Sequence, residues 1–250
     1  MKARATTVAL IPALLLAVAG CSGADTPATG KAPGPQGSAA ASSGAPGAPG
    51  APAGSATPGP APTGLQRAAL EQGDLPGYQV SAQGKNPNAP DGQPQADKKT
   101  CQPLADIMGD KPDPAARETV NRGIGSQKQV GLAVSASVSS YAESDAKRLL
   151  SRLREAVAAC GPGFTATVEK QTGSYRDVKA VPYKTAGDES VSWTTTVAAE
   201  GVSAQVHVVV VREGDTVARL MALNVAGAGQ KAQVPQEVTD KQLEKVRKTG

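Results

Sequence analysis

The stretch QVGLAVSASVSSYAESDAKRLLSRLREAVAAC, residues 129–160, contains the two patterns that decide the fold. From Val130 to Val138, apolar residues alternate with small ones, which predicts a strand with one apolar face. The next part predicts an amphipathic helix, which Gly161 and Pro162 end in the order typical of a helix C-terminus. The apolar stripe of this helix consists of Ala146, Leu149, Leu150, Leu153, Val157 and Cys160.

Three further strands are predicted in quick succession, over residues 191–199, 202–212 and 216–225. Glu200–Gly201 and the segment 213–215 have the composition of hairpin turns, so the three strands form an antiparallel meander. Weaker patterns predict helices at 65–73, 101–108, from Asp113–Pro114 onward and at 235–248, and strands at 78–82, 164–170 and 178–181. The predicted fold class is α+β, with a mainly antiparallel sheet and flanking helices.

A two-residue turn at Glu200–Gly201 fixes the register of the meander, because paired residue numbers then sum to a constant. Trp193 lies opposite Val208, on the face that we expect to be the core. The other face would carry a polar set, which is Thr194, Thr196, Gln205, His207 and Asn224. This set is either a shallow ligand groove or the solvated face that antiparallel sheets commonly have.

The N-terminus has the layout of an export signal. Lys2 and Arg4 precede an apolar run from Val8 to Val18, which is too short to span a bilayer by itself. The following Ala19-Gly20-Cys21 resembles the lipobox of bacterial lipoproteins. That resemblance implies cleavage after residue 20 and a diacylglyceryl group on Cys21, which anchors the chain to the membrane. The alternative is an ordinary secretory signal that a cysteine follows by chance.

Residues 21–64 are predicted to be a disordered tether. After Cys21 the segment consists of Ala, Gly, Pro, Ser and Thr, apart from Asp25, Lys31 and Gln36. It has no large apolar side chain whose burial could offset the entropy lost on ordering. Residues 65–250 remain, which is enough for a single domain with a sizeable core.

Two cysteines remain once Cys21 is assigned to the anchor. Export places Cys101 and Cys160 in an oxidising compartment, where an even count predicts a disulfide. A reactive thiol is the alternative, although the chain has no Cys-x-x-Cys and its only histidine is His207.

Charge and motifs weigh against several classes of function. The net charge is +4, and the chain has only six aromatic residues, so no basic stripe with interleaved aromatics predicts nucleic-acid binding. No clustered ligands predict a metal site, and no motif predicts a cofactor or a catalytic residue. Paired carboxylates of the kind found in glycosidases stay possible, because distances in space cannot be read from a sequence.

Several short segments carry a resemblance to a known family. They are Gly73-Asp74-Leu75-Pro76-Gly77-Tyr78, Cys101, the helix ending at Cys160, and Gly187-Asp188-Glu189-Ser190 before a strand. In this order they resemble the extracytoplasmic sensor domain of bacterial serine/threonine receptor kinases of the PknH-like group, which also occurs in free-standing lipoproteins. The resemblance implies an antiparallel sheet with helices on one side, a groove for a ligand, and a binding module instead of an enzyme.

The expected function is therefore a non-enzymatic sensor or binding lipoprotein on the extracytoplasmic face of the cell membrane. Its partner would be a ligand or protein of the cell envelope. A lipid or glycolipid carrier and an envelope hydrolase are the alternatives. A lipid carrier would need a cavity walled by aliphatic residues from both faces of the sheet. Ser135, Ser137 and Ser139 argue against two apolar faces here.

Overall fold

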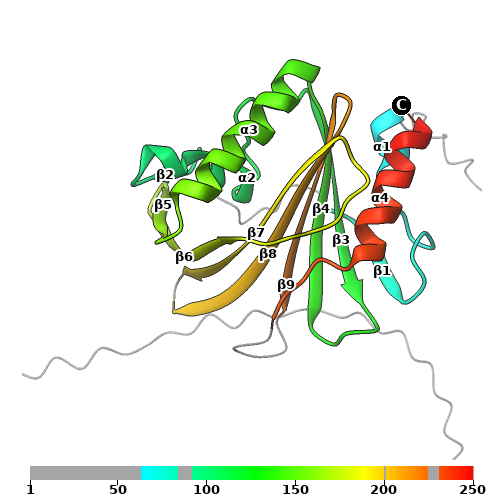
Figure 1. The fold of residues 1–250 in the computed structure, drawn as a ribbon. Coiled ribbons are helices and arrows are strands. Elements are labelled where there is room, and N and C mark those ends of the chain that lie inside the picture. Colours follow the sequence, from blue (N-terminus) through cyan, green and yellow to red (C-terminus); the bar gives the residue numbers. More distant parts are fainter. Residues whose placement is uncertain (1–62, 84–91, 200, 225–230, 250) are drawn as a thin grey trace, which may run out of the picture. The chain divides into compact units, whose positions relative to one another are not determined.

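One antiparallel sheet of nine strands organises the described part of the protein in the computed structural model (Figure 1). The structure describes residues 63–83, 92–199, 201–224 and 231–249, which all belong to one compact unit spanning residues 57–250. The predicted signal, Cys21 and most of the predicted tether lie outside the described residues. The fold class is α+β, as predicted.

The strands follow the spatial order β1-β3-β4-β9-β8-β7-β6-β5-β2, and every neighbouring pair is antiparallel. Their bounds are β1 Tyr78–Gln83, β2 Gln95–Ala96, β3 Glu118–Ser126, β4 Leu132–Ser140, β5 Phe164–Val168, β6 Gln171–Ala180, β7 Glu189–Ala199, β8 Val202–Glu213 and β9 Thr216–Asn224. The predicted meander is β7-β8-β9, and it forms the middle of the sheet. Trp193 pairs with Val208, so the predicted register is confirmed.

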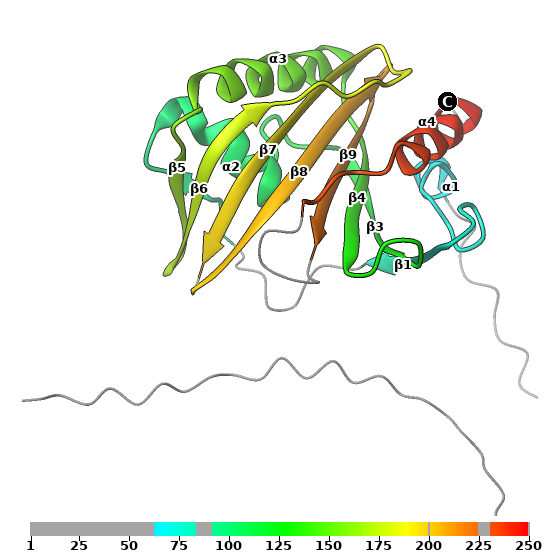
Figure 2. The same cartoon turned by 60° about the horizontal axis from the view of Figure 1, so that its bottom comes forward.

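Among the described residues, four α-helices and one 3-10 turn flank the sheet. They are α1 Gly64–Ala68, η1 Lys99–Cys101, α2 Gln102–Met108, α3 Glu143–Ala159 and α4 Gln236–Thr249. Figure 2 shows α3 running along one side of the sheet, and α4 and α1 lying close together on the other side. No helix in the described ranges is long and apolar enough to cross a membrane.

Two hydrophobic clusters bury both faces of the central strands. Val208 and Val210 of β8 pack with α2 and α3, whereas Val209 and Val211 pack with α4. Alternate residues of one strand point to opposite faces, so the two helix pairs cover opposite sides of the sheet. The implied arrangement with all helices on one side is therefore wrong.

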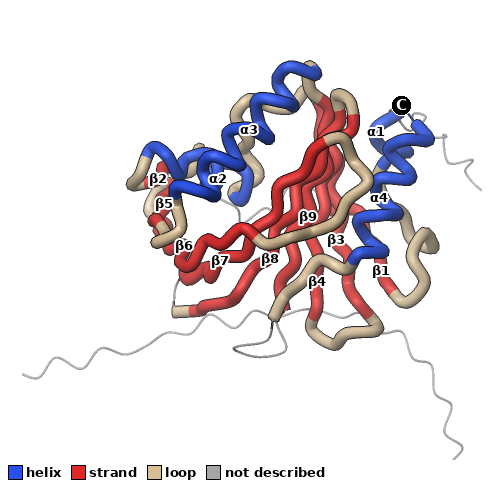
Figure 3. The backbone as a smooth tube through the Cα atoms, in the orientation of Figure 1, coloured by secondary structure: helices blue, strands red, loops and turns tan. Residues whose placement is uncertain are grey.

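The prediction of a helix starting at Asp113–Pro114 is also wrong. Residues 109–117 form a loop, and β3 follows it at Glu118 (Figure 3). β3 has only one buried residue, Ile124, so its sequence lacks the apolar alternation that identifies a strand. This missed strand brings β1 and β4 into one sheet.

Candidate functional site

The predicted polar set lies on one face of the meander, as its register requires. Thr194 is directly opposite His207, and Thr196 is opposite Gln205. Asn224 lies on the same side of β9, since it is two residues beyond Ala222, which pairs with His207. The assignment of these residues to the face away from Trp193 is confirmed.

The expectation of an open groove around His207 is wrong. His207 is only 2% exposed and Asn224 is 7% exposed. The segment that leads into α4 covers the histidine, and the backbone N–H of Val234 donates to its Nδ1 over 3.0 Å. Thr194, Thr196 and Gln205 are half-buried, and their role as ligand contacts stays a prediction.

The contacts of His207 also leave no ring nitrogen free for chemistry. Because Nδ1 accepts from Val234, the neutral ring carries its proton on Nε2, which lies 2.8 Å from the Ser192 hydroxyl. Burial lowers the pKa of His207 to about 4. A histidine held neutral with both nitrogens bonded is a structural group, not a general base.

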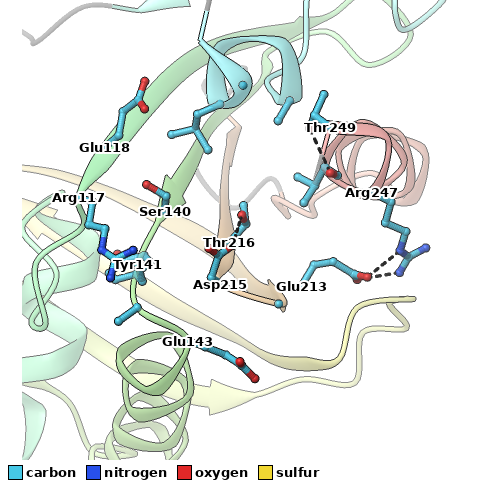
Figure 4. Close-up of a pocket in the computed structure, with 16 residues that line it drawn as sticks. Arg117, Glu118, Ser140, Tyr141, Glu143, Glu213, Asp215, Thr216, Arg247 and Thr249 are labelled. Atoms are coloured by element: carbon cyan, nitrogen blue, oxygen red, sulfur yellow. Dashed lines mark hydrogen bonds and ion pairs between the residues drawn. The ribbon is translucent and has the colours of Figure 1, made fainter.

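A large cavity of about 880 Å³ lies at the end of the sheet where α3 begins (Figure 4). Its walls come from five places: the first turn of α1, the start of β3, the β4–α3 junction, the β8–β9 turn and the end of α4. The lining residues are Gly64, Leu65, Ala68, Arg117, Glu118, Ser140, Tyr141, Ala142, Glu143, Glu213, Gly214, Asp215, Thr216, Val246, Arg247 and Thr249. We call this cavity the terminal cleft.

Acidic groups outnumber basic ones in the terminal cleft. Four carboxylates, on Glu118, Glu143, Glu213 and Asp215, face two guanidinium groups, on Arg117 and Arg247. The difference gives the described lining a formal charge of −2.

Two of the lining carboxylates form ion pairs, one with Arg247 of the cleft and one with a lysine outside its lining. Arg247 binds Glu213 through two contacts, of 3.0 and 2.9 Å, which raise the pKa of the arginine. Lys147 lies 2.7 Å from Glu143 and lowers the pKa of that carboxyl group. An acid catalyst at neutral pH needs a raised carboxyl pKa, and that of Glu143 is lowered instead.

Two other kinds of reactive centre can be checked in the described residues, a free cysteine thiol and a metal site. Cys101 and Cys160 form a disulfide with a Cα–Cα distance of 5.9 Å, so neither is a reactive thiol. Within residues 63–83, 92–199, 201–224 and 231–249, no group of three or more histidine, cysteine or carboxylate side chains is placed to hold a metal ion.

A second polar surface lies on the sheet face that α2 and α3 share. There β1, β3, β4 and β9 present polar and small side chains, and Gln79, Gln83, Gly125 and Ala133 are exposed. A cavity of about 570 Å³ runs over this surface. The serines at 135, 137 and 139 indicated a polar face on β4. The sequence did not predict β3, so it could not show that this face continues onto the neighbouring strands.

Comparison with known proteins gives fold similarities and no sequence family. No family model and no curated protein matches the sequence. The chain is similar to the extracellular domain of PknH from Mycobacterium tuberculosis, with 13% identity and a TM-score of 0.40 over 69% of this chain and 81% of that one. It is also similar to an Rv0999 ortholog from Mycobacterium smegmatis, with 10% identity and a TM-score of 0.38 over 70% of this chain and 90% of that one.

Proposed function

We propose that the protein is a non-enzymatic binding module, held by a lipid on the extracytoplasmic face of the cell membrane. In this proposal the terminal cleft binds a cell-envelope ligand or protein segment that carries a positive group. The observation that carries the proposal is the position of α1, which is the first described element after the predicted tether and forms one wall of the cleft. Ligand contacts with α1 would therefore act next to the point where the tether enters the domain.

The location rests on two independent features of the chain. The N-terminal signal and Cys21 resemble those of exported lipoproteins. The Cys101–Cys160 disulfide fits an oxidising compartment, which lies outside the cytoplasm in most bacteria. Both features support extracytoplasmic residence, and Cys21 supports the lipid anchor.

Binding without turnover is supported by the electrostatics of the terminal cleft. Lys147 lowers the pKa of Glu143, and burial raises the pKa of Tyr141 to about 12, so neither group is suited to donate a proton at neutral pH. A lipid carrier would need a cavity with mainly apolar walls, whereas six charged side chains line this one.

The proposal is tested by titrating the full chain with a peptidoglycan stem peptide that bears a free side-chain amine, and with the same peptide after N-acetylation of that amine. The amine-bearing form should bind more tightly, and its affinity should fall as salt is added. Asp215→Asn, which removes a charge from the cleft, should weaken binding roughly two- to fivefold. Equal affinities for the two peptides would contradict the proposal.

Glu169→Gln is the matched control, because Glu169 is an exposed carboxylate that does not line the cleft. Its affinity should equal that of the wild type. If it weakens binding as much as Asp215→Asn, the effect reports net charge and the cleft is not the site. Release of hydrolysed fragments during the titration would indicate an enzyme instead, and lipid recovered by solvent extraction would indicate a carrier.

A further inference from the structure

A smaller cavity of about 300 Å³ lies beneath the loop at residues 109–117, on the sheet face shared with α2. It is separate from the terminal cleft, although Tyr141 lines both. Three neighbouring strands form its floor, where Asn121, Ser137 and Arg219 lie side by side in register. Thr119 and Ala115 are exposed at its rim, so the cavity can be reached from solvent.

Arg219 is a buried cation whose hydrogen bonds are incomplete. Its side chain is 6% exposed, one terminal nitrogen donates to the Ile107 carbonyl over 2.6 Å, and the other lies 3.1 Å from Asp110 Oδ1. Its Nε has no hydrogen-bond partner among the residues that the structure describes. A buried donor without a partner is unusual in a folded protein and has an energetic cost.

Asn121 supplies the complementary group. Its Nδ2 lies 3.5 Å from Asp110 Oδ2. A carboxylate only accepts hydrogen bonds, so this contact fixes which end of the amide is the nitrogen. The buried Oδ1 of Asn121 then has no partner in the described part of the chain. One carboxylate thus holds both side chains and leaves one free donor and one free acceptor.

We propose that this cavity binds a secondary amide, whose carbonyl accepts from Arg219 Nε while its N–H donates to Asn121 Oδ1. Asp110 already pairs with Arg219, and an anion drawn in by Lys111, the other cation of the lining, would meet the lone pairs of the Asn121 oxygen. A cation would meet the guanidinium group. A neutral group with one acceptor and one donor satisfies both buried atoms at once.

The size of the cavity limits what can enter. About 300 Å³ is the lower end of the range for small-molecule sites, which suits one amide and the groups attached to it. The remainder of a larger ligand would extend past the exposed Thr119. Two sources offer such an amide, an N-acetylated sugar and a peptide backbone, and the experiment has an arm for each.

The test follows the Nε–H resonance of Arg219 in the ¹⁵N-labelled full chain. N-acetylglucosamine and N-acetylalanine methylamide are the two amide arms, methyl acetate can accept but not donate, and sodium acetate tests for an anion site. At least one amide should shift the resonance saturably, with an affinity about tenfold higher than that of the ester. Whichever amide binds identifies the source, and binding of both indicates that the amide alone is recognised.

The proposal is overturned if neither amide moves the resonance, if the ester binds as well as the amides, or if acetate binds best. Asn121→Leu keeps the side-chain size and removes the acceptor, so the amide affinity should fall about tenfold and the preference over the ester should vanish. Gln83→Leu is the matched control, because Gln83 pairs with Asn121 across β1 and β3 but does not line this cavity. Its affinity should stay within about twofold of the wild-type value.

Unfolding curves of both variants check that they are folded. If Asn121→Leu binds the amides normally, or Gln83→Leu loses as much affinity as Asn121→Leu, the site is not this cavity. The wild-type resonance keeps the test decisive even if a variant does not fold. The proposal does not depend on the function proposed for the terminal cleft, and Asp215→Asn should leave amide binding unchanged.

Discussion

His207 shows how the surroundings of one side chain can reverse the role that its position suggests. On an open sheet face it would titrate near neutral pH and could bind a ligand. In this protein the segment before α4 and the ring of Tyr183, 5.5 Å away, cover it. The histidine instead joins β7, β8 and the C-terminal segment through the hydroxyl of Ser192 and the backbone of Val234.

The buried His207 should make the protein less stable in mild acid. Its pKa is 6.5 in an unfolded chain and about 4 in the folded one. Between these values the unfolded state binds the proton and the folded state does not, so stability falls as pH drops through this window. From pH 7.5 to pH 5 this histidine alone should lower the free energy of unfolding by about 2 kcal/mol.

Urea unfolding of the wild type and His207→Leu at both pH values measures this contribution. The variant should be less stable at pH 7.5, because Ser192 and the Val234 N–H lose a partner. At pH 5 the difference in the free energy of unfolding between the wild type and the variant should be smaller by about 2 kcal/mol. Parallel pH profiles would show that His207 does not titrate with unfolding.

Residue-level alternation was the most informative signal in the sequence. It placed Trp193 opposite Val208, and it put His207 and Thr194 together on the other face, all of which the structure has. It could not show which face is solvated, because Val209 and Val211 sit among the polar residues and α4 covers them. A strand pattern identifies faces, and the covering element is decided elsewhere in the chain.

At the scale of elements, one buried glutamine supports the contact between α1 and α4, where Ala68 and Val246 also pack together. Gln242 is fully buried, its Nε2 donates to the Ala68 carbonyl over 2.6 Å, and its Oε1 accepts from the Leu70 N–H over 3.3 Å. These are backbone groups at the C-terminal end of α1, where the helix leaves carbonyls without partners. Since α1 has only five residues, this support fixes one wall of the terminal cleft.

Gln242→Leu should therefore cost about 3 kcal/mol of the free energy of unfolding, because two buried backbone groups lose their partners. Gln236→Leu on the same helix is the control. Gln236 is exposed although it also donates to a carbonyl, that of Lys184, and its loss should cost less than about 1 kcal/mol. Chemical denaturation of both variants measures the difference, and equal losses would mean that Gln242 does not hold α1.

The disulfide holds α2 against α3, as Gln242 holds α1 against α4. Cys101 precedes α2 and Cys160 follows α3, and the bridge closes a loop with a sequence separation of 59. In the chain-entropy model such a bridge contributes about 4 kcal/mol. Replacing both cysteines with alanine should lower the free energy of unfolding by about that amount, measured in urea under non-reducing conditions.

Mass spectrometry of the non-reduced exported protein provides the direct check of this bridge. The peptides that contain Cys101 and Cys160 should be linked, and alkylation should find no free thiol on either. Two free thiols would contradict the pairing. If the peptides are linked but the double variant loses no stability, the unfolded chain is already compact, so the bridge does not restrict it further.

Elements with a strong apolar period were predictable, and those without one were not. The stripe of α3 and the three meander strands were found because every second, third or fourth residue is apolar. β3 was missed because its sequence, ETVNRGIGS, pairs through its backbone and buries only Ile124. The polar cavity around Arg219 was missed with it, since Asn121 belongs to β3.

At the scale of the whole molecule, the central strands of the described domain have apolar faces, and the outer strands have a polar face. Helices bury both faces of the central strands, while the outer strands β1 and β3 leave a polar face open beside α2. The terminal cleft lies at the end of the sheet where α3 begins, and α1 forms one of its walls (Figure 4). Both candidate binding sites are therefore in the half of the sheet that contains β3 and β4.

We predict that lipidation of Cys21 attaches the whole chain to the membrane. The residue lies outside the described part of the structure, and the prediction rests on its position after Leu16-Ala17-Val18-Ala19-Gly20. A single acyl chain gives only marginal membrane binding, whereas the lipid of a processed lipoprotein has more than one. Cells that express the protein and are fed labelled palmitate should therefore label the wild-type chain, and Cys21→Ser should abolish that label.

The neighbouring variant Ser22→Ala is the control, because it changes the same segment and keeps the cysteine. It should label and sediment with membranes like the wild type. Cys21→Ser should instead appear in the soluble extracytoplasmic fraction or accumulate as an unprocessed precursor, since the apolar run is too short to serve as a stable membrane span. If Cys21→Ser were labelled and sedimented like the wild type, Cys21 would not be the lipidated residue and the anchor would have to lie elsewhere in the chain.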